Sequence, residues 1–212
     1  MKTGNVSPEL RIERLNSLLH GFGILFGIIS MPILILNATK SDSLPKVAAS
    51  GIYGFCFLML FTASTLYHAF QQPKLKEALK ILDHISIYFL IAGTYTPLIL
   101  VFVFNSFGIS LLIVLWSLTL LGIIFKLFFT GRFEILSTLI YVLMGWILFA
   151  GGKKFFIAMP APVIALVTIG GCLYSIGVIF YLWERPRYHH AIWHLFVLAA
   201  AICHYTAVLI SI

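Results

Sequence analysis

Long apolar runs separated by short polar breaks dominate the chain. A helix that crosses about 30 Å of hydrocarbon needs about 20 mainly apolar residues, and runs of this kind occur seven times. The predicted membrane-spanning helices cover residues about 17–36, 47–69, 85–104, 107–126, 135–151, 162–183 and 191–212. The polar breaks are too short for a soluble domain. The pattern therefore predicts one all-α integral membrane domain over residues 1–212, with seven transmembrane helices.

Composition agrees with a membrane protein. Of the 212 residues, 61% are hydrophobic and 10% are charged, whereas a soluble domain has about 45–50% apolar and about 25% charged residues. Cys56, Cys172 and Cys203 lie in apolar runs and are predicted to be small buried hydrophobes. The start of the chain carries Glu9 and Glu13 and no small-residue cleavage site. The first apolar run is therefore expected to be a retained helix rather than a signal peptide.

The net charge of +7 would suggest nucleic acid as the partner of a soluble protein, but its distribution indicates membrane orientation instead. Because consecutive spans alternate the faces of the membrane, the bases can be counted by side. Ten fall on one side, Lys2, Arg11, Arg14, Lys74, Lys76, Lys80, Lys126, Arg132, Arg185 and Arg187, and four on the other, Lys40, Lys46, Lys153 and Lys154. The positive-inside rule then predicts a cytoplasmic N-terminus and a C-terminus outside. The expected partners are membrane lipids, not nucleic acid.

Several histidines stand at the ends of predicted spans, where ionisable side chains are costly and mark functional sites. His68 ends the second span, Asp83 precedes the third, and His190 and His194 flank the start of the seventh. Residues i and i+4 share a helix face, so His190 and His194 can direct ring nitrogens at one metal ion, and Ser64 lies on the face of His68. A third histidine from another helix would complete the three protein ligands typical of a catalytic zinc site.

The predicted topology places these residues at one membrane depth. The second span runs toward the cytoplasm and the third and seventh start there, so His68, Asp83, His190 and His194 all lie near the cytoplasmic face. A lone histidine in a membrane helix is more often a packing or interfacial residue than a ligand. Spacing, shared depth and a nearby carboxylate together favour a metal site over that interpretation.

The remaining histidines are weaker candidates for metal ligands. His84 projects about 100° away from Asp83 on a helix, and His189 is assigned to the loop before the seventh span. His204 is about 15 Å deeper than His194, so a hydrogen bond within the bundle is its expected role. The candidates for lining the entrance or the wall of the site are Glu13, Asn16, His20, His84 and His204.

Four motifs together resemble a known family. They are SxxxH at residues 64–68, DHISIYFLIAGTYTP at 83–97, ERLNSLLHGFG at 13–23 and HAIWHLFVLAAAICH at 190–204. In combination they resemble the hemolysin III proteins, the bacterial branch of the progestin and adipoQ receptor family, which includes the adiponectin receptors and is related to alkaline ceramidases. The resemblance covers nearly the whole chain.

The resemblance implies a seven-helix protein of the bacterial plasma membrane with its N-terminus inside. It also implies Zn²⁺ held by His68, His190 and His194, with Ser64 and Asp83 holding or activating the water on the zinc. The family is associated with haemolysis and with membrane homeostasis, and neither association identifies a substrate.

Three functions are consistent with these residues. The first is a zinc-dependent, ceramidase-like hydrolase of a lipid amide or ester, in which Asp83 handles the proton and Ser64 donates a hydrogen bond to the oxyanion. The second is a non-enzymatic membrane sensor or receptor with a structural zinc, for which Asp83 would supply a fourth ligand. The third is a pore-forming haemolysin, which is disfavoured because the spans lack a polar stripe wide enough for a channel.

Overall fold

All regular elements are helical in the part of the chain that the computed structural model describes, which is residues 7–150 and 152–212 without the side chains of Ala150 and Lys154. They are α1 (Pro8–Thr39), α2 (Leu44–Ala69), α3 (Pro73–Phe102), α4 (Ser106–Phe129), α5 (Glu134–Gly145), α6 (Ile147–Ala150), α7 (Lys153–Ala158), α8 (Ala161–Leu182) and α9 (His189–Leu209). Six of them, α1, α2, α3, α4, α8 and α9, are long and apolar enough to cross a membrane. Lys2 and residue 151, which the predicted charge count and fifth span include, lie outside the described residues.

Local sequence signals set the helix starts. At the start of α1 the Ser7 hydroxyl accepts a hydrogen bond from the Leu10 amide at 3.3 Å, and Asn105 accepts one from the Gly108 amide at 3.1 Å before α4. These side chains satisfy amides that have no partner within the helix. Proline stands in the first turn of α1, α2, α3 and α8, where its missing amide costs nothing.

Two helices begin well before the apolar runs that predicted them. The first starts at Pro8 instead of about residue 17, and α3 starts at Pro73 instead of about residue 85. Hydropathy detects only the part of a helix that lies in hydrocarbon, whereas these polar first turns continue the same backbone. Asp83 and His84 therefore lie about three turns inside α3 rather than at its start.

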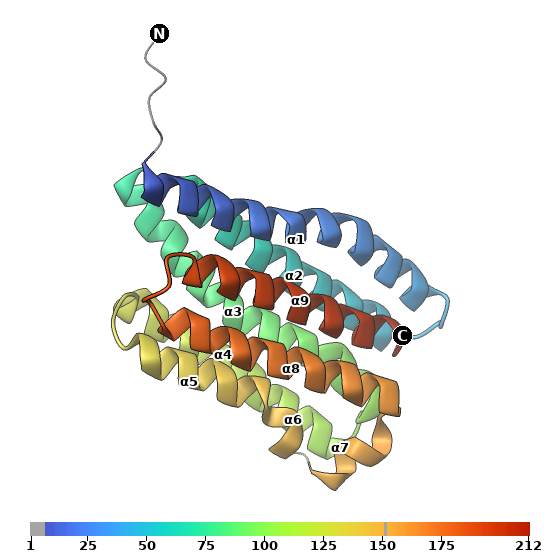
Figure 1. Cartoon of the computed structure of the whole chain (residues 1–212). Coiled ribbons are helices and arrows are strands. Elements are labelled where there is room, and N and C mark those ends of the chain that lie inside the picture. The colour runs from blue at the N-terminus through green and yellow to red at the C-terminus, as the bar shows by residue number, and fades with distance from the viewer. Residues whose placement is uncertain (1–6, 151) are drawn as a thin grey trace.

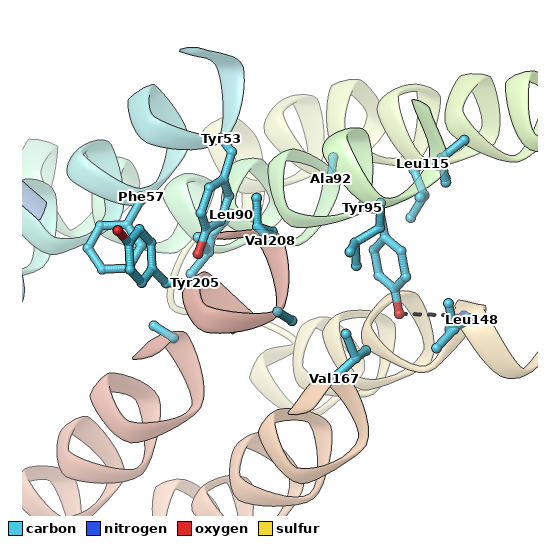
Figure 2. Close-up of a cluster of buried hydrophobic side chains, with 14 of the residues drawn as sticks. Tyr53, Phe57, Leu90, Ala92, Tyr95, Leu115, Leu148, Val167, Tyr205 and Val208 are labelled. Atoms are coloured by element: carbon cyan, nitrogen blue, oxygen red, sulfur yellow. Dashed lines mark hydrogen bonds between the residues drawn. The ribbon is translucent and has the colours of Figure 1, made fainter. Parts of the chain in front are cut away.

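The predicted fifth span is not a continuous helix. It is divided into α5, with 12 residues, and α6, with four, by a break at Trp146. The Tyr95 hydroxyl bridges the break, because it donates to the Gly145 carbonyl at 2.5 Å and accepts from the Leu148 amide at 3.4 Å (Figure 2). Six continuous helices of the described residues are thus long enough to cross a membrane, and the predicted fifth span is an interrupted segment that runs along the bundle from α5 through α6 toward α7 (Figure 1).

The helices enclose a central space. Contacts link α1 to α2, α2 to α3, α3 to α5, α5 to α8, α8 to α9 and α9 back to α1, while α4 packs on α3 (Figure 1). Aromatic side chains fill the core between α2 and α9, where Tyr53 and Phe57 lie near Tyr205 (Figure 2). The Tyr205 hydroxyl donates to the Ser30 carbonyl of α1 at 3.0 Å and so fixes α9 against the first helix.

Small residues in the helices have mixed roles. A Cβ atom on Gly23 would lie 2.1 Å from Phe61 and one on Gly170 would lie 2.3 Å from His204, whereas one on Gly21 would meet nothing within 4 Å. Helix packing therefore accounts for the first two glycines but not for Gly21. The prediction that all three cysteines are buried is wrong for Cys172, which is exposed, because it lies on the outer face of α8.

Candidate metal centre

Three histidines from two helices meet at one end of the bundle. His68 closes the last turn of α2, and His190 and His194 occupy successive turns at the start of α9. One ring nitrogen of each lies within 4.8 Å of those of the other two, and the Nε2 atoms of His68 and His194 are 3.0 Å apart. Among the described residues this is the group of side chains that can hold a metal ion. The i, i+4 spacing on α9 thus places two ligands where the end of α2 supplies a third.

The outer nitrogens of two of these histidines are held by α1. His68 Nδ1 lies 2.7 Å from the Glu13 Oε2 atom, and His194 Nδ1 lies 2.7 Å from His20 Nε2. A neutral imidazole has one N–H donor and one acceptor nitrogen, so donation to Glu13 leaves the lone pair of His68 at Nε2. If His194 likewise donates to His20, its Nε2 lone pair points at the same place.

This arrangement fits a bound zinc ion. Ligating histidines commonly donate their other N–H to a carboxylate or a further polar group, which fixes the tautomer. At Zn–N distances of about 2.0–2.1 Å in a tetrahedral site, ligand nitrogens stand about 3.3 Å apart, close to the 3.0 Å between His68 and His194. The three histidines could therefore hold a metal ion.

Ser64 and Asp83 lie beside the histidine group. Both line a cavity of about 340 Å³ that His190 and His194 also line. The Ser64 hydroxyl is buried and lies beside the Asp83 carboxyl group. Both groups line the cavity, where they can form hydrogen bonds to a water molecule or a ligand.

The cavity continues from the histidine group along the bundle. Its walls come from α3, α5, α8 and α9, and its lining extends to Tyr95, Trp146 and His204. From His190 to His204 along α9 is about 21 Å at 1.5 Å per residue. Between these ends the lining is mainly apolar, with Leu90 and Val197 among its side chains. The acidic and basic side chains other than His204 thus lie at the end with the histidine group, and the rest of the lining is mainly apolar, with some hydroxyl groups.

The structure places the other predicted site residues in different positions. His20 lines the cavity as predicted, but it is buried, with 2% exposed, and packs on His194. Asn16, one turn earlier, is also buried, and its Oδ1 atom has no hydrogen-bond partner among the described residues. His204 makes a hydrogen bond to the Val167 carbonyl at 3.2 Å, which confirms its expected role. His189 is the first residue of α9 rather than a loop residue, because the helix begins two residues earlier than predicted.

Sequence reasoning missed one charged cluster at the same end of the bundle. Lys126, which was counted as an interfacial base, is fully buried, and its Nζ atom lies 3.1 Å from Glu134 Oε2. His84 Nδ1 lies 3.8 Å from the other oxygen of Glu134. The sequence did contain a signal for this cluster, since a lysine and a glutamate stand eight residues apart on either side of a turn that contains glycine. Neither hydropathy nor a charge count considers the two residues as a pair.

Six apolar spans and a histidine group able to hold a metal define a multi-pass integral membrane protein with a candidate metal centre. Comparison with known sequences assigns its family. Residues 9–205 match the model of the family described as haemolysin-III related, and the chain belongs to that family, as its motifs predicted.

Relatives extend from bacteria to mammals. The chain is 40% identical to the hemolysin-3 homolog of Bacillus subtilis (strain 168), over 94% of each chain. It is 41% identical to hemolysin-3 of Bacillus cereus, over 94% of this chain and 91% of the relative. A more distant relative is the human monocyte to macrophage differentiation factor, at 26% identity over 97% of this chain and 86% of the relative. The last match supports the relation to the progestin and adipoQ receptor family.

Proposed function

We propose that this protein is a zinc-dependent hydrolase that cleaves an amide or ester bond of a membrane lipid and thereby contributes to membrane homeostasis. The observation that carries the proposal is the single cavity in which Ser64, Asp83, His190 and His194 stand at one end and apolar side chains line the rest. A lipid has this same distribution of polar and apolar parts. His68, His190 and His194 would hold the ion.

The reaction divides between the ion and the side chains of the chain. Zinc, when bound, supplies Lewis acidity at the scissile carbonyl and makes water more acidic. Asp83 accepts a proton from the water as its oxygen adds to the carbonyl carbon, and returns that proton to the nitrogen or oxygen that leaves as the bond breaks. The Ser64 hydroxyl donates a hydrogen bond to the carbonyl oxygen as negative charge develops there.

Three single variants test this division of roles in purified protein, with zinc content and the release of fatty acid from a panel of N-acyl and O-acyl lipids as readouts. Removing a ligand with His190→Ala is expected to abolish both zinc binding and turnover. Asp83→Asn is expected to retain zinc and to lose turnover. His189→Ala is the matched control, since this neighbouring histidine lies outside the ligand group, and both readouts should stay at the wild-type level. Unchanged turnover in Asp83→Asn would contradict the mechanism.

A structural metal in a sensor or receptor is the second candidate. The observation that favours it is the set of contacts from Glu13 and His20 on α1 to His68 on α2 and His194 on α9. A metal held by the three histidines would join α2 to α9 as a clamp, and these contacts would hold α1 against both. A closed, four-ligand site is typical of structural zinc. Asp83 is not one of the three residues in the ligand group, which supports an open position. Zinc removal that lowers only the melting temperature, with no lipid turned over, would favour the clamp.

The proposed membrane arrangement counts α5 and α6 as one interrupted crossing. Seven crossings then place the N-terminus in the cytoplasm and the C-terminus outside, with the histidine group near the cytoplasmic face of the bacterial plasma membrane. The uneven distribution of Lys and Arg supports this orientation.

A further inference from the structure

The cavity has a basic wall that the proposed reaction does not use. It is formed where α3 approaches the turn between α4 and α5, and it contains Lys80, His84, Lys126 and Glu134. Lys80, His84 and Glu134 line the cavity, while Lys126 lies behind them. Three nitrogen-bearing side chains thus surround one carboxylate.

Both carboxylate oxygens of Glu134 already have partners within the protein. Its Oε2 atom pairs with Lys126 Nζ at 3.1 Å, and its Oε1 atom accepts a hydrogen bond from the Gly131 amide at 3.0 Å. Lys126 is completely buried, and a buried ammonium group needs a charged partner. The charge of Glu134 is therefore committed to Lys126, and the pair as a whole is neutral.

His84 has an unused donor at the cavity wall. Its side chain is buried, with the residue 8% exposed, and its Nδ1 atom has no hydrogen-bond partner among the described residues. The Nδ1 atom is 3.8 Å from Glu134 Oε1, which is too long for a hydrogen bond. A neutral imidazole protonated at Nδ1 can donate this hydrogen to a ligand in the cavity.

Lys80 adds a second positive charge beside the pair formed by Lys126 and Glu134. It lies one turn before His84 on the same face of α3, and its Nζ atom is 3.5 Å from the position that a Cβ atom on Gly131 would occupy. Among the ion pairs of the described residues, none involves Lys80. The other acidic residues that line the cavity are Asp83, beside the histidine group, and Glu184, which is exposed beyond the end of α8. The wall formed by Lys80, His84, Lys126 and Glu134 therefore holds two ammonium groups against one carboxylate.

The position of this wall relates it to the metal centre. Lys80 is about 4.5 Å nearer the start of α3 than Asp83, so it lies toward the polar end of the cavity, away from the apolar lining. A ligand with its acyl chain along the apolar lining and its carbonyl at Asp83 would carry its polar group on to Lys80 and His84.

We propose that Lys80 and His84 bind the anionic group, a phosphate or a carboxylate, of a lipid whose single acyl chain occupies the cavity. The substrate class is then an acyl lipid with an anion a few bonds beyond the scissile amide or ester. This assignment rests on the proposed hydrolase function for the reaction, but the binding site can be tested without any turnover.

The test compares two ether lipids that cannot be hydrolysed at an acyl bond, a 1-O-alkyl glycerol phosphate and the 1-O-alkyl glycerol of the same chain length. Their dissociation constants are measured by titration calorimetry on the full-length protein in an uncharged maltoside detergent. The wild type is expected to bind the phosphate lipid at least about tenfold more tightly, because hydrogen bonds to charged groups contribute about 1.5–3 kcal/mol each and about 1.4 kcal/mol is tenfold.

Variants identify the residue responsible for the preference. Lys80→Gln is expected to reduce the ratio of the two dissociation constants to less than about threefold, while Lys80→Arg keeps most of it. Lys74→Gln, which removes an exposed lysine from the same end of α3, is the matched control and should keep the wild-type ratio. Equal binding of the two lipids by the wild type, or an unchanged ratio in Lys80→Gln, would overturn the proposal.

Inorganic phosphate distinguishes a lipid headgroup from a free anion. The headgroup assignment predicts that millimolar phosphate competes only weakly with the phosphate lipid. Phosphate that binds as tightly as the lipid would overturn this assignment. A clear preference for the phosphate lipid combined with no hydrolysis of any acyl lipid would contradict the proposed function while leaving the binding site supported.

Discussion

Single side chains decide how the candidate centre is built. Glu13 touches His68 through one carboxylate oxygen and Lys76 through the other, at 2.7 Å and 3.1 Å. This one residue on α1 therefore joins the end of α2 to the first turns of α3. His20 joins α1 to α9 through its contact with His194. Neither residue reaches the ion position itself, so both are positioning residues for ligands that belong to other helices.

The contact between Glu13 and His68 should strengthen metal binding. Glu13→Gln removes the charged acceptor of His68, and outer partners of ligands of this kind typically contribute about 10–100-fold to metal affinity. We expect the zinc dissociation constant to rise by about this factor, with the helical content unchanged. Competition with a chromophoric chelator measures the constant, and the visible spectrum of cobalt-substituted protein reports the ligand geometry.

Glu9→Gln is the matched control for this experiment. Glu9 is an exposed carboxylate one turn earlier on α1, with no contact to His68 among the described residues. Its removal should leave zinc affinity and the cobalt spectrum as in the wild type. An equal loss of affinity in both variants would show that the helix start, rather than the contact with His68, is responsible.

At the scale of helices, close approach depends on particular glycines. The α1 backbone at Gly23 leaves no space for a methyl group, because the Phe61 ring of α2 occupies it. Phe61 is fully buried and also packs on His20 with ring centroids 5.0 Å apart. The separation of α1 from α2 is therefore coupled to the position of His20, and through it to His194.

A pair of alanine substitutions on α1 tests this packing. Gly23→Ala forces overpacking, which typically costs about 1–3 kcal/mol, so we expect a lower melting temperature in detergent. Gly21→Ala adds a methyl group into open space and favours the helix by up to about 1 kcal/mol, so its melting temperature should equal or exceed that of the wild type. A similar decrease in both variants would mean that the close contact at Gly23 is not what limits stability.

At the scale of the whole molecule, the interrupted segment decides the number of crossings. The buried contact of Lys126 with Glu134 places the end of α4 beside the start of α5. From there α5 and α6 lead to the opposite end of the bundle, where α7 connects to α8 (Figure 1). Residues on the two sides of this segment should therefore face opposite sides of the membrane.

Single cysteines provide the measurement of topology. In a background without Cys56, Cys172 and Cys203, a membrane-impermeant maleimide added to intact cells should label Lys153→Cys but not Arg132→Cys. Both positions are exposed, so labelling of Arg132→Cys should appear once the membrane is permeabilised. Labelling of both positions from the same side would exclude a crossing by α5 and α6 and leave six spans.

The helical class, most of the spans and the three histidines follow from the amino-acid sequence alone. Hydropathy is a sum over neighbouring residues, and the spacing of His190 and His194 is fixed by helix geometry, so neither requires knowledge of the fold. The same logic failed at Trp146, since the break in the fifth span depends on the distant Tyr95 hydroxyl. The count of charges along the sequence also treated Lys126 as an interfacial base, because such a count cannot reveal that a lysine is buried beside Glu134.

Only the tertiary structure decided which side chains complete the site. Glu13 and His68 are 55 residues apart and His20 and His194 are 174 apart, and no local pattern encodes contacts at such separations. They arise from the order in which five long helices and one interrupted segment close around a cavity. Local hydrogen bonding and hydropathy make each helix separately, whereas packing between helices brings the polar groups of α1, α3 and α5 to the histidine group.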